Sequence, residues 1–224
     1  MSSQRPPGDD DLSLEVYGGM AREQDDGSHL VSIRTSRGDI PAIMHLCEGG
    51  EEAIIWVCGA IGGFDGPAEG IYASLGQALV ESGVTSLRLN YRLPNEFEEC
   101  VLDTLGGVSF LKGIGASGVA LVGHSFGGAV VIAAGGLSPN VKAVAALSSQ
   151  TRGATGAGQL SPRPLLLVHG EEDTRLPPTC SQLIYDWAQT PKELVLIPGA
   201  GHSLRERRED LYNLLKQWLV VNLR

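Results

Sequence analysis

The chain has 224 residues, of which 42% are hydrophobic and 19% are charged, and its formal net charge at pH 7 is −9. This composition is typical of a folded domain with its own core, and such an acidic protein is a poor partner for phosphate backbones, so we expect no nucleic-acid binding. No apolar run approaches the ~20 residues that a transmembrane helix needs. The first eleven residues also lack the apolar stretch of a secretory signal. We therefore expect no transmembrane segment and a cytoplasmic protein, or an organellar one whose transit peptide has been removed.

Four cysteines are spread along the chain, at Cys47, Cys58, Cys100 and Cys180. They show neither CxxC spacing nor the neighbouring histidine pattern that zinc sites use. We therefore expect free, buried thiols, no metal site and no cofactor.

The chain begins with a segment rich in proline, glycine and aspartate. Such a composition does not bury enough apolar surface to offset the entropy lost on ordering, so we expect residues 1–26 to be disordered or irregular. From residue 27 to residue 224 no linker, repeat or low-complexity tract interrupts the sequence. We expect this stretch to form a single domain.

Two short alternating segments follow, at residues 29–34 and 40–46, on either side of the polar turn 36–39. Alternation of apolar and polar residues around such a turn predicts an antiparallel hairpin. Six nearly continuous apolar runs come later, and such runs are typical of strands covered on both faces, as in a parallel sheet between helices. These runs are residues 53–57, 84–89, 119–122, 141–147, 165–168 and 194–197.

Helical periodicity fills several of the connections between these runs. The apolar stripes are Ile71, Leu75 and Leu79; Phe97, Val101, Leu105 and Val108; and Leu204, Leu211, Leu215 and Trp218. Strands that alternate with helices predict an α/β domain. We expect an eight-stranded, mostly parallel sheet whose first pair is antiparallel, with helices on both faces.

The pentapeptide G-H-S-F-G at residues 123–127 lies between a predicted buried strand and a predicted helix of small residues. This spacing places Ser125 on a sharp strand-to-helix turn, where its hydroxyl projects above the sheet. Gly123 and Gly127 leave room for the turn, and the positive end of the following helix dipole favours a developing anion. The segment therefore predicts a nucleophilic serine. The alternative is a glycine-rich turn that holds a serine by chance.

A nucleophilic serine requires a base, and the base requires an acid that orients it. Glu171, Glu172 and Asp173 follow the seventh predicted strand, and His202 follows the eighth. These positions lie past the carboxyl ends of strands, at the edge where open α/β sheets build their sites. The order serine, acid, histidine therefore predicts a catalytic triad, with the acid still open among three carboxylates.

Three motifs together resemble the α/β-hydrolase family: G-H-S-F-G at 123–127, H-G-E-E-D-T-R-L-P at 169–177 and G-A-G-H at 199–202. The resemblance extends from about residue 28 to the end of the chain, and the chain is similar in size to dienelactone hydrolases. It implies an α/β-hydrolase fold with little or no cap, and an activity of the serine esterase or thioesterase type.

The resemblance also implies roles for individual residues. Ser125 is expected to be the nucleophile, and His202 the general base and then the general acid. Asp173 is expected to fix the imidazole, because it matches the family's H-G-x-x-D position, whereas Glu171 and Glu172 lie earlier in the turn.

An oxyanion hole needs two backbone N–H donors, and the family places one of them on the residue after the nucleophile, here Phe126. The other is expected from the loop after the third predicted strand, with Ala60 as the first choice and Ile61 as the second. Cys58 stands where a histidine is common in the family, but a backbone donor does not require that histidine. We interpret Cys58 as a small buried residue.

Residues 148–162 occupy the position at which family members often insert a lid, but they are rich in glycine, serine and threonine. We expect no helical cap and an open, shallow cleft. Tyr91 and Arg92, which follow the fourth predicted strand, and Leu176, near the acid, are candidate substrate-binding residues.

The substrate is then expected to be a small-molecule ester or thioester, with water as the acceptor. An acyltransferase that uses the same triad, and a catalytically silent binding protein of the same fold, are the alternatives. The sequence distinguishes neither ester from thioester nor hydrolase from transferase, and it gives no oligomeric state.

Overall fold

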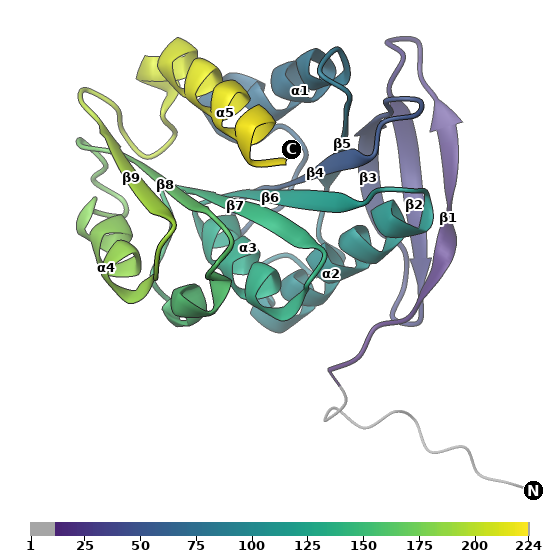
Figure 1. The fold of residues 1–224 in the computed structure, drawn as a ribbon, viewed down its shortest axis with the longest axis horizontal. Helices are drawn as coiled ribbons and strands as arrows, with labels where there is room; N and C mark the ends of the chain where they lie inside the picture. The colour runs from purple at the N-terminus through teal and green to yellow at the C-terminus, as the bar shows by residue number, and fades with distance from the viewer. Residues whose placement is uncertain (1–11, 224) are drawn as a thin grey trace, which may run out of the picture.

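A single sheet runs through the computed structural model, which describes residues 12–223 (Figure 1). Within these residues the sheet has nine strands in the order β1-β2-β3-β5-β4-β6-β7-β8-β9. The strands are β1 (Val16–Glu23), β2 (His29–Thr35), β3 (Ile40–His45), β4 (Glu52–Val57), β5 (Val84–Leu89), β6 (Gly118–His124), β7 (Val141–Leu147), β8 (Leu165–Gly170) and β9 (Lys192–Ile197). The six strands β4 to β9 pair with one another in parallel. Strands β1, β2 and β3 form an antiparallel edge, and β3 joins it to β5.

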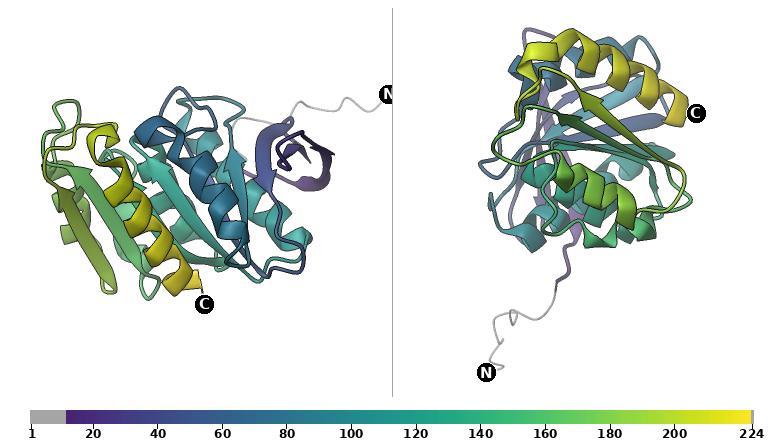
Figure 2. Two further views of the ribbon diagram at one scale, coloured as in Figure 1. Left: turned by 90° about the horizontal axis from the view of Figure 1, so that it is seen from above. Right: turned by 90° about the vertical axis from the view of Figure 1, so that its left-hand side faces the viewer.

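Helices cover both faces of this sheet, as the views in Figures 1 and 2 show. Helices α1 (Pro67–Val80) and α5 (Arg208–Leu223) pack on one face. Helices α2 (Phe97–Gly113), α3 (Phe126–Leu137) and α4 (Thr179–Trp187) pack on the other. Two short 3₁₀ helices, η1 (Thr155–Leu160) and η2 (Arg205–Arg207), complete the regular structure of the described residues.

The residues of β4 show why the apolar runs form strands with two covered faces. Ala53, Ile55 and Val57 point into the core beneath α2 and α3, while Ile54 and Trp56 point into the core beneath α1 and α5. Successive side chains of a strand point to opposite faces, so a strand buried on both sides must be apolar at every position. The expected α/β architecture, a mostly parallel sheet with helices on both faces, is confirmed.

The N-terminal part of the chain contains a strand that the sequence analysis did not predict. Strand β1 (Val16–Glu23) pairs antiparallel with β2, so the expectation of a disordered or irregular segment is wrong for these residues, and the sheet has nine strands rather than eight within the described residues. Six of the eight β1 residues are exposed and two residues are glycines, so the strand carries no apolar alternation. Residues 1–11 lie outside the described part of the chain.

Two further details near the C-terminus differ from expectation. Helix α4 had no predicted counterpart, because within it only Ser181 and Ile184 are fully buried. Leu204 is buried but lies before η2 in a left-handed conformation, with φ 56°, so the last helix starts at Arg208 and Leu204 is not part of it.

Residues 148–162 contain η1, which is a single short 3₁₀ helix, and Ala157 and Leu160 anchor it in the core beneath α3. The segment therefore folds against the side of the domain. Within residues 12–223, no helix combines the length and the apolarity that crossing a membrane requires.

Candidate active site

Ser125 occupies the turn that joins β6 to α3. Its backbone angles are φ 57° and ψ −116°, a conformation that costs free energy for a residue with a side chain and is concentrated at functional sites. Its N–H donates to the carbonyl oxygen of Leu147 in the neighbouring strand at 2.8 Å, which holds the strained turn against the sheet. The geometry matches the sharp turn that the G-x-S-x-G spacing predicts.

Two glycines allow this turn because the backbone passes too close to itself for a side chain. A Cβ atom on Gly123 would collide with the carbonyl oxygen of Gly127. A Cβ atom on Gly127 would collide with the carbonyl oxygen of Cys58, at the end of β4. The motif therefore brings the start of α3 into contact with the neighbouring loop as well as turning the chain.

The structure brings Ser125, His202 and Asp173 together from three different loops at the carboxyl edge of the sheet. His202 Nε2 lies 3.1 Å from Ser125 Oγ, and His202 Nδ1 lies 2.7 Å from Asp173 Oδ2. Because a carboxylate oxygen only accepts, Nδ1 donates to Asp173 and Nε2 is left to accept the Ser125 proton. The side chains of Glu171 and Glu172 are exposed instead.

The carboxylate of Asp173 is buried and fully engaged. The backbone N–H groups of Arg175 and Leu176 each donate to Oδ1 at 2.9 Å, while His202 donates to Oδ2. Burial favours a higher pKa for Asp173, but the hydrogen bonds from Leu176, His202 and Arg175 outweigh it and lower the pKa below its ordinary value. Asp173 is therefore a carboxylate at neutral pH, as an acceptor for the His202 N–H must be.

A second imidazole reaches the same carboxylate oxygen. His169 is completely buried, and its Nε2 lies 3.1 Å from Asp173 Oδ2 and 2.9 Å from the carbonyl oxygen of Leu176. Both partners are acceptors, so Nε2 carries the proton, and Nδ1 accepts from the Ser181 hydroxyl at 2.7 Å. Its spacing of four residues from Asp173 in the sequence does not reveal that the two side chains share a hydrogen bond.

His124 supports the other side of His202. Its Nε2 donates to the backbone carbonyl oxygen of His202 at 2.9 Å, and the two ring centres are 4.9 Å apart. Burial, assisted by the neighbouring His202, lowers the pKa of His124 to about 4. His124 is thus neutral at physiological pH, and it fixes the loop that carries His202.

The loop after β4 lies beside Ser125 and contains a tight turn. Gly62 N–H donates to the Gly59 carbonyl oxygen at 3.0 Å, which makes Ala60 and Ile61 the two central residues of a turn. The N–H groups of central turn residues point away from the turn's own hydrogen bond. The backbone N–H groups of Ala60, Ile61 and Phe126 donate no turn or loop hydrogen bond to another group among the described residues.

Asn90, the residue directly after β5, anchors this loop. Its side-chain oxygen accepts from the N–H of Gly63 at 2.8 Å and from the N–H of Tyr91 at 3.0 Å. Tyr91 itself is buried, and its hydroxyl donates to the carbonyl oxygen of Cys58 at 3.2 Å. Sequence analysis missed Asn90, because a single polar residue after a strand carries no signal of the loop that it holds.

A cavity of about 370 Å³ opens above Ser125. It is lined by residues 58–66, His124, Ser125, Arg175 and His202. Among the described residues, none from 148–162 lines it, in keeping with the expected absence of a helical cap. A depression of about 440 Å³ lies between β9 and α5, but it contains none of these polar groups.

The three predicted substrate-binding residues do not line this cavity. Tyr91 is buried beneath the loop, in edge-to-face contact with Phe126 at 6.1 Å between ring centres. Leu176 is half-buried, and its backbone holds Asp173 and His169. Both residues therefore support the site from behind.

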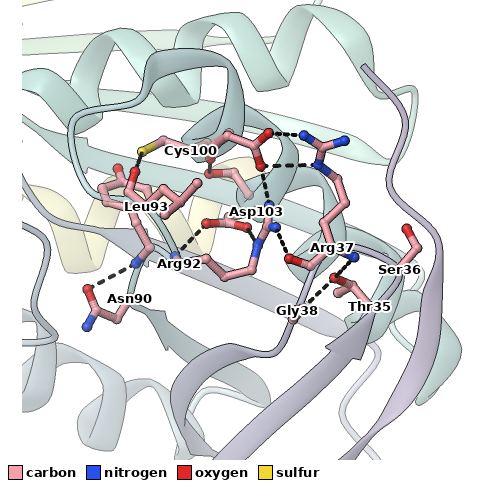
Figure 3. A network of polar contacts seen from close by, with 12 residues as sticks. Thr35, Ser36, Arg37, Gly38, Asn90, Arg92, Leu93, Cys100 and Asp103 are labelled. Carbon is pink, nitrogen blue, oxygen red and sulfur yellow. Dashed lines mark hydrogen bonds and ion pairs between the residues drawn. The ribbon is translucent and has the colours of Figure 1, made fainter. Parts of the chain in front are cut away.

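Arg92 is the clearest correction, and Figure 3 shows why. Its guanidinium is almost fully buried and forms ion pairs with Asp103 and, at 2.8 Å, with Glu99 of α2. It also donates to the carbonyl oxygen of Arg37 at 2.7 Å, and Arg37 pairs with Glu99 in turn. With its donors used inside the fold, Arg92 joins the β2–β3 connection to α2 and does not face the cavity.

The four cysteines are free, but only Cys58 and Cys100 are buried, while Cys47 and Cys180 are partly exposed. Burial raises the pKa of the Cys58 thiol to about 11, so Cys58 is protonated at neutral pH although it lines the same cavity as Ser125. Within residues 12–223, no group of three or more histidine, cysteine, aspartate or glutamate side chains is arranged to hold a metal ion.

Sequence comparisons match only short segments of the chain. No protein-family model matches it. Over 55 residues, 24% of this chain, it is 42% identical to an uncharacterized protein, YfhR, of Escherichia coli K12, and over 63 residues it is 38% identical to a monoglyceride lipase of Saccharomyces cerevisiae. The matched segments span about a fifth of the length of these relatives, 19% and 20% respectively.

Solved structures match nearly the whole chain. A dienelactone hydrolase from Anabaena variabilis superposes with a TM-score of 0.75 at 17% identity, covering 93% of this chain and 100% of that one. Est1E from Butyrivibrio proteoclasticus superposes with a TM-score of 0.70 at 19% identity, covering 92% of this chain and 98% of that one. At such identities the likeness concerns the fold, and it extends over more than nine tenths of the chain.

Proposed function

The protein has the α/β-hydrolase fold, and we propose that it is a serine hydrolase that cleaves a carboxylic ester or thioester through an acyl-serine intermediate. The observation that carries this proposal is the hydrogen-bonded chain from Ser125 through His202 to Asp173, with a strained serine at the floor of a cavity. The printed names of similar proteins, a dienelactone hydrolase and a monoglyceride lipase, support hydrolysis of an ester.

In the proposed first step, Ser125 Oγ attacks the carbonyl carbon of the substrate while His202 Nε2 takes the hydroxyl proton. Asp173 accepts a hydrogen bond from His202 Nδ1–H throughout and stabilises the imidazolium that forms. The new C–O bond places a negative charge on the carbonyl oxygen. Backbone N–H groups of Phe126 and of Ala60, or Ile61 as the second choice, are the proposed donors to that oxygen.

Collapse of the tetrahedral intermediate breaks the bond to the leaving alcohol or thiol, and His202 returns its proton to the leaving oxygen or sulfur. Water then enters, gives its proton to His202 and attacks the acyl-serine carbon. The second collapse releases the carboxylic acid and restores the Ser125 hydroxyl. In this proposal His169, on Asp173, and His124, on the His202 loop, hold the triad in place during these transfers.

The open cavity bears on the choice of acyl group. Each methylene that a substrate buries contributes about 0.8 kcal/mol, so an enclosing tunnel would favour long chains steeply. A cavity of about 370 Å³ without a cap offers little such wall. We therefore propose short acyl groups as substrates, without activation at lipid interfaces.

The proposal is tested by measuring kcat/KM for p-nitrophenyl esters from acetate to palmitate, below the concentrations at which micelles form, alongside a matched thioester. We expect the highest values at short chains and no turnover above background for the Ser125→Ala variant. A steady rise of kcat/KM towards palmitate would reveal a long apolar pocket and contradict the proposal that short acyl groups are the substrates. Absence of turnover in the wild-type protein would favour the silent binding protein instead.

An acyltransferase is the second candidate, because the same acyl-serine can be attacked by an alcohol or thiol. Adding such acceptors to the ester assay distinguishes the two functions. Free acid as the main product in their presence supports the hydrolase, whereas near-complete acyl transfer would contradict it.

A further inference from the structure

Arg175 lies two residues after Asp173 and lines the cavity above Ser125. Its backbone N–H donates to Asp173 Oδ1 at 2.9 Å, and the next N–H, of Leu176, donates to the same atom at the same distance. The start of the Arg175 side chain is therefore fixed relative to the triad. The residue is exposed, and it lies at the wall of the cavity.

The guanidinium of Arg175 has no carboxylate partner within residues 12–223, although the chain has 26 acidic residues against 17 basic ones. Arg37, Arg88, Arg92, Arg205 and Arg207 each form an ion pair. Arg175 therefore brings a positive charge without an ion-pair partner among the described residues to the wall of the cavity that Ser125 lines.

The other charged residue of the cavity wall is already compensated. Asp65 lies in the loop after β4, and its side chain is 78% exposed. Its Oδ1 lies 3.3 Å from the buried guanidinium of Arg88, which approaches from β5 beneath the loop. The uncompensated charge in the cavity is therefore the positive charge of Arg175, beside two histidines.

We propose that Arg175 binds a carboxylate of the substrate, so that the preferred esters carry an anionic group in addition to the bond that is cleaved. This inference rests on the proposed hydrolase function and names its substrate class. A guanidinium presents parallel N–H donors that match the two oxygens of a carboxylate, which gives both affinity and orientation.

Two features of the molecule make this local charge necessary for such a substrate. The net charge of −9 repels anions from the protein as a whole, so only a cation within the cavity can select them. The cavity is also small, about 370 Å³, and contains both Ser125 and Arg175 in its wall. The carboxylate is therefore expected within a few bonds of the ester carbonyl.

The test compares three p-nitrophenyl esters with six-carbon acyl chains: neutral hexanoate, anionic hydrogen adipate and cationic 6-aminohexanoate. Each is assayed with the wild-type protein, with Arg175→Gln and with Arg205→Gln. Arg205 is a matched control because it is an arginine at the start of η2, 63% exposed and absent from the cavity wall.

We expect Arg175→Gln to lower the adipate-to-hexanoate ratio of kcat/KM by about 10- to 100-fold, the range typical for losing hydrogen bonds to a charged group. Hexanoate alone should change by less than about threefold, and Arg205→Gln should leave the ratio unchanged. An unchanged ratio in Arg175→Gln would overturn the proposal. A wild-type preference for the cationic ester would overturn it too, and would point to Asp65.

Glutarate binding, measured by calorimetry, gives a readout that does not require hydrolysis. We expect the wild-type protein to bind glutarate and Arg175→Gln to bind it at least about tenfold more weakly. Equal affinities, or no binding to the wild type, would overturn the carboxylate site. Failure to hydrolyse hexanoate would instead contradict the proposed hydrolase function, so the two failures are distinguishable.

Discussion

Two polar clusters of this protein use similar residues for different ends. The triad cluster consists of Ser125, Asp173 and His202 with His169, and the arginine cluster consists of Arg37, Arg92, Glu99 and Asp103. Each contains a carboxylate with no exposed side-chain surface and basic groups gathered around it. They differ in where the chain of hydrogen bonds ends.

In the arginine cluster the charged groups of Arg92, Glu99 and Asp103 are each paired with another group of the fold (Figure 3). Burial raises the pKa of Asp103, and the hydrogen bonds and charge of Arg92 only partly offset this effect. In the triad cluster the chain ends at the Ser125 hydroxyl, which faces a cavity from a strained backbone. A cluster whose polar groups are all paired with one another contributes to the stability of the fold. A cluster that includes a hydroxyl at a cavity can also react with a bound molecule.

The largest effect should come from Ser125→Ala, which removes that accessible end. We expect kcat to fall by about 10⁴- to 10⁶-fold, since only binding and the backbone donors then remain. The variant should remain as stable as the wild-type protein, and ester hydrolysis at saturating substrate together with thermal unfolding checks both points. Turnover near that of the wild type would mean that Ser125 is not the nucleophile.

The opposite behaviour is expected of Asp103→Asn in the arginine cluster. The substitution removes the fully buried one of the two carboxylates that pair with Arg92, so the free energy of unfolding should fall by about 3 kcal/mol, as measured by urea denaturation. The kcat of the folded protein should stay within about twofold of the wild-type value. Glu98→Gln, which removes an exposed carboxylate on the same helix, is the control and should change neither quantity. A large loss of kcat in Asp103→Asn would contradict the claim that the arginine cluster contributes to stability and not to catalysis.

His169 lies inside the triad cluster but does not touch the cavity, so its removal should give an intermediate effect. His169→Phe removes the donor to Asp173 Oδ2, and we expect kcat to fall by about 10- to 100-fold with little change in KM. His169→Gln retains an N–H donor and should recover most of the activity, which separates positioning from packing. If the two variants have equal kcat, or if KM alone changes, His169 does not position the acid.

The smallest effect concerns pH and His124. Its pKa of about 4 in the folded protein lies below the ~6.5 of an unfolded histidine. Between about pH 4 and 6.5 the histidine is therefore mostly protonated in the unfolded state and mostly neutral in the folded state. Stability should therefore fall as the pH falls from 7 to 5. In His124→Gln this loss should be smaller by about 1–2 kcal/mol, as measured by urea denaturation at both pH values. An identical loss in both proteins would show that His124 does not titrate in this way.

The sequence predicted those features that depend on local patterns. Apolar runs such as residues 53–57 predicted strands because burial on both faces leaves no polar position. The spacing around Ser125 predicted the turn, because only glycines fit where Gly123 and Gly127 approach their neighbours. The positions of Asp173 and His202 after successive strands predicted that they meet.

Other features depend on partners from distant parts of the chain, and no local pattern reveals them. Strand β1 is held by backbone pairing to β2, which needs no apolar side chains. Arg92 was expected in the site because it follows a strand, but its place is decided by Arg37, 55 residues away, and by Asp103 of α2. Asn90 acquires its role through Gly63, 27 residues away.

The central claim, that Ser125 is an activated nucleophile, is tested most directly by covalent labelling. A fluorophosphonate reacts with an activated serine hydroxyl, and mass spectrometry of the digested protein identifies the labelled peptide. We expect one adduct, on Ser125, absent in Ser125→Ala and formed at least about 100-fold more slowly in His202→Gln, because the general base is then missing. No adduct on the folded wild-type protein, or an adduct on another residue that persists in Ser125→Ala, would contradict the account.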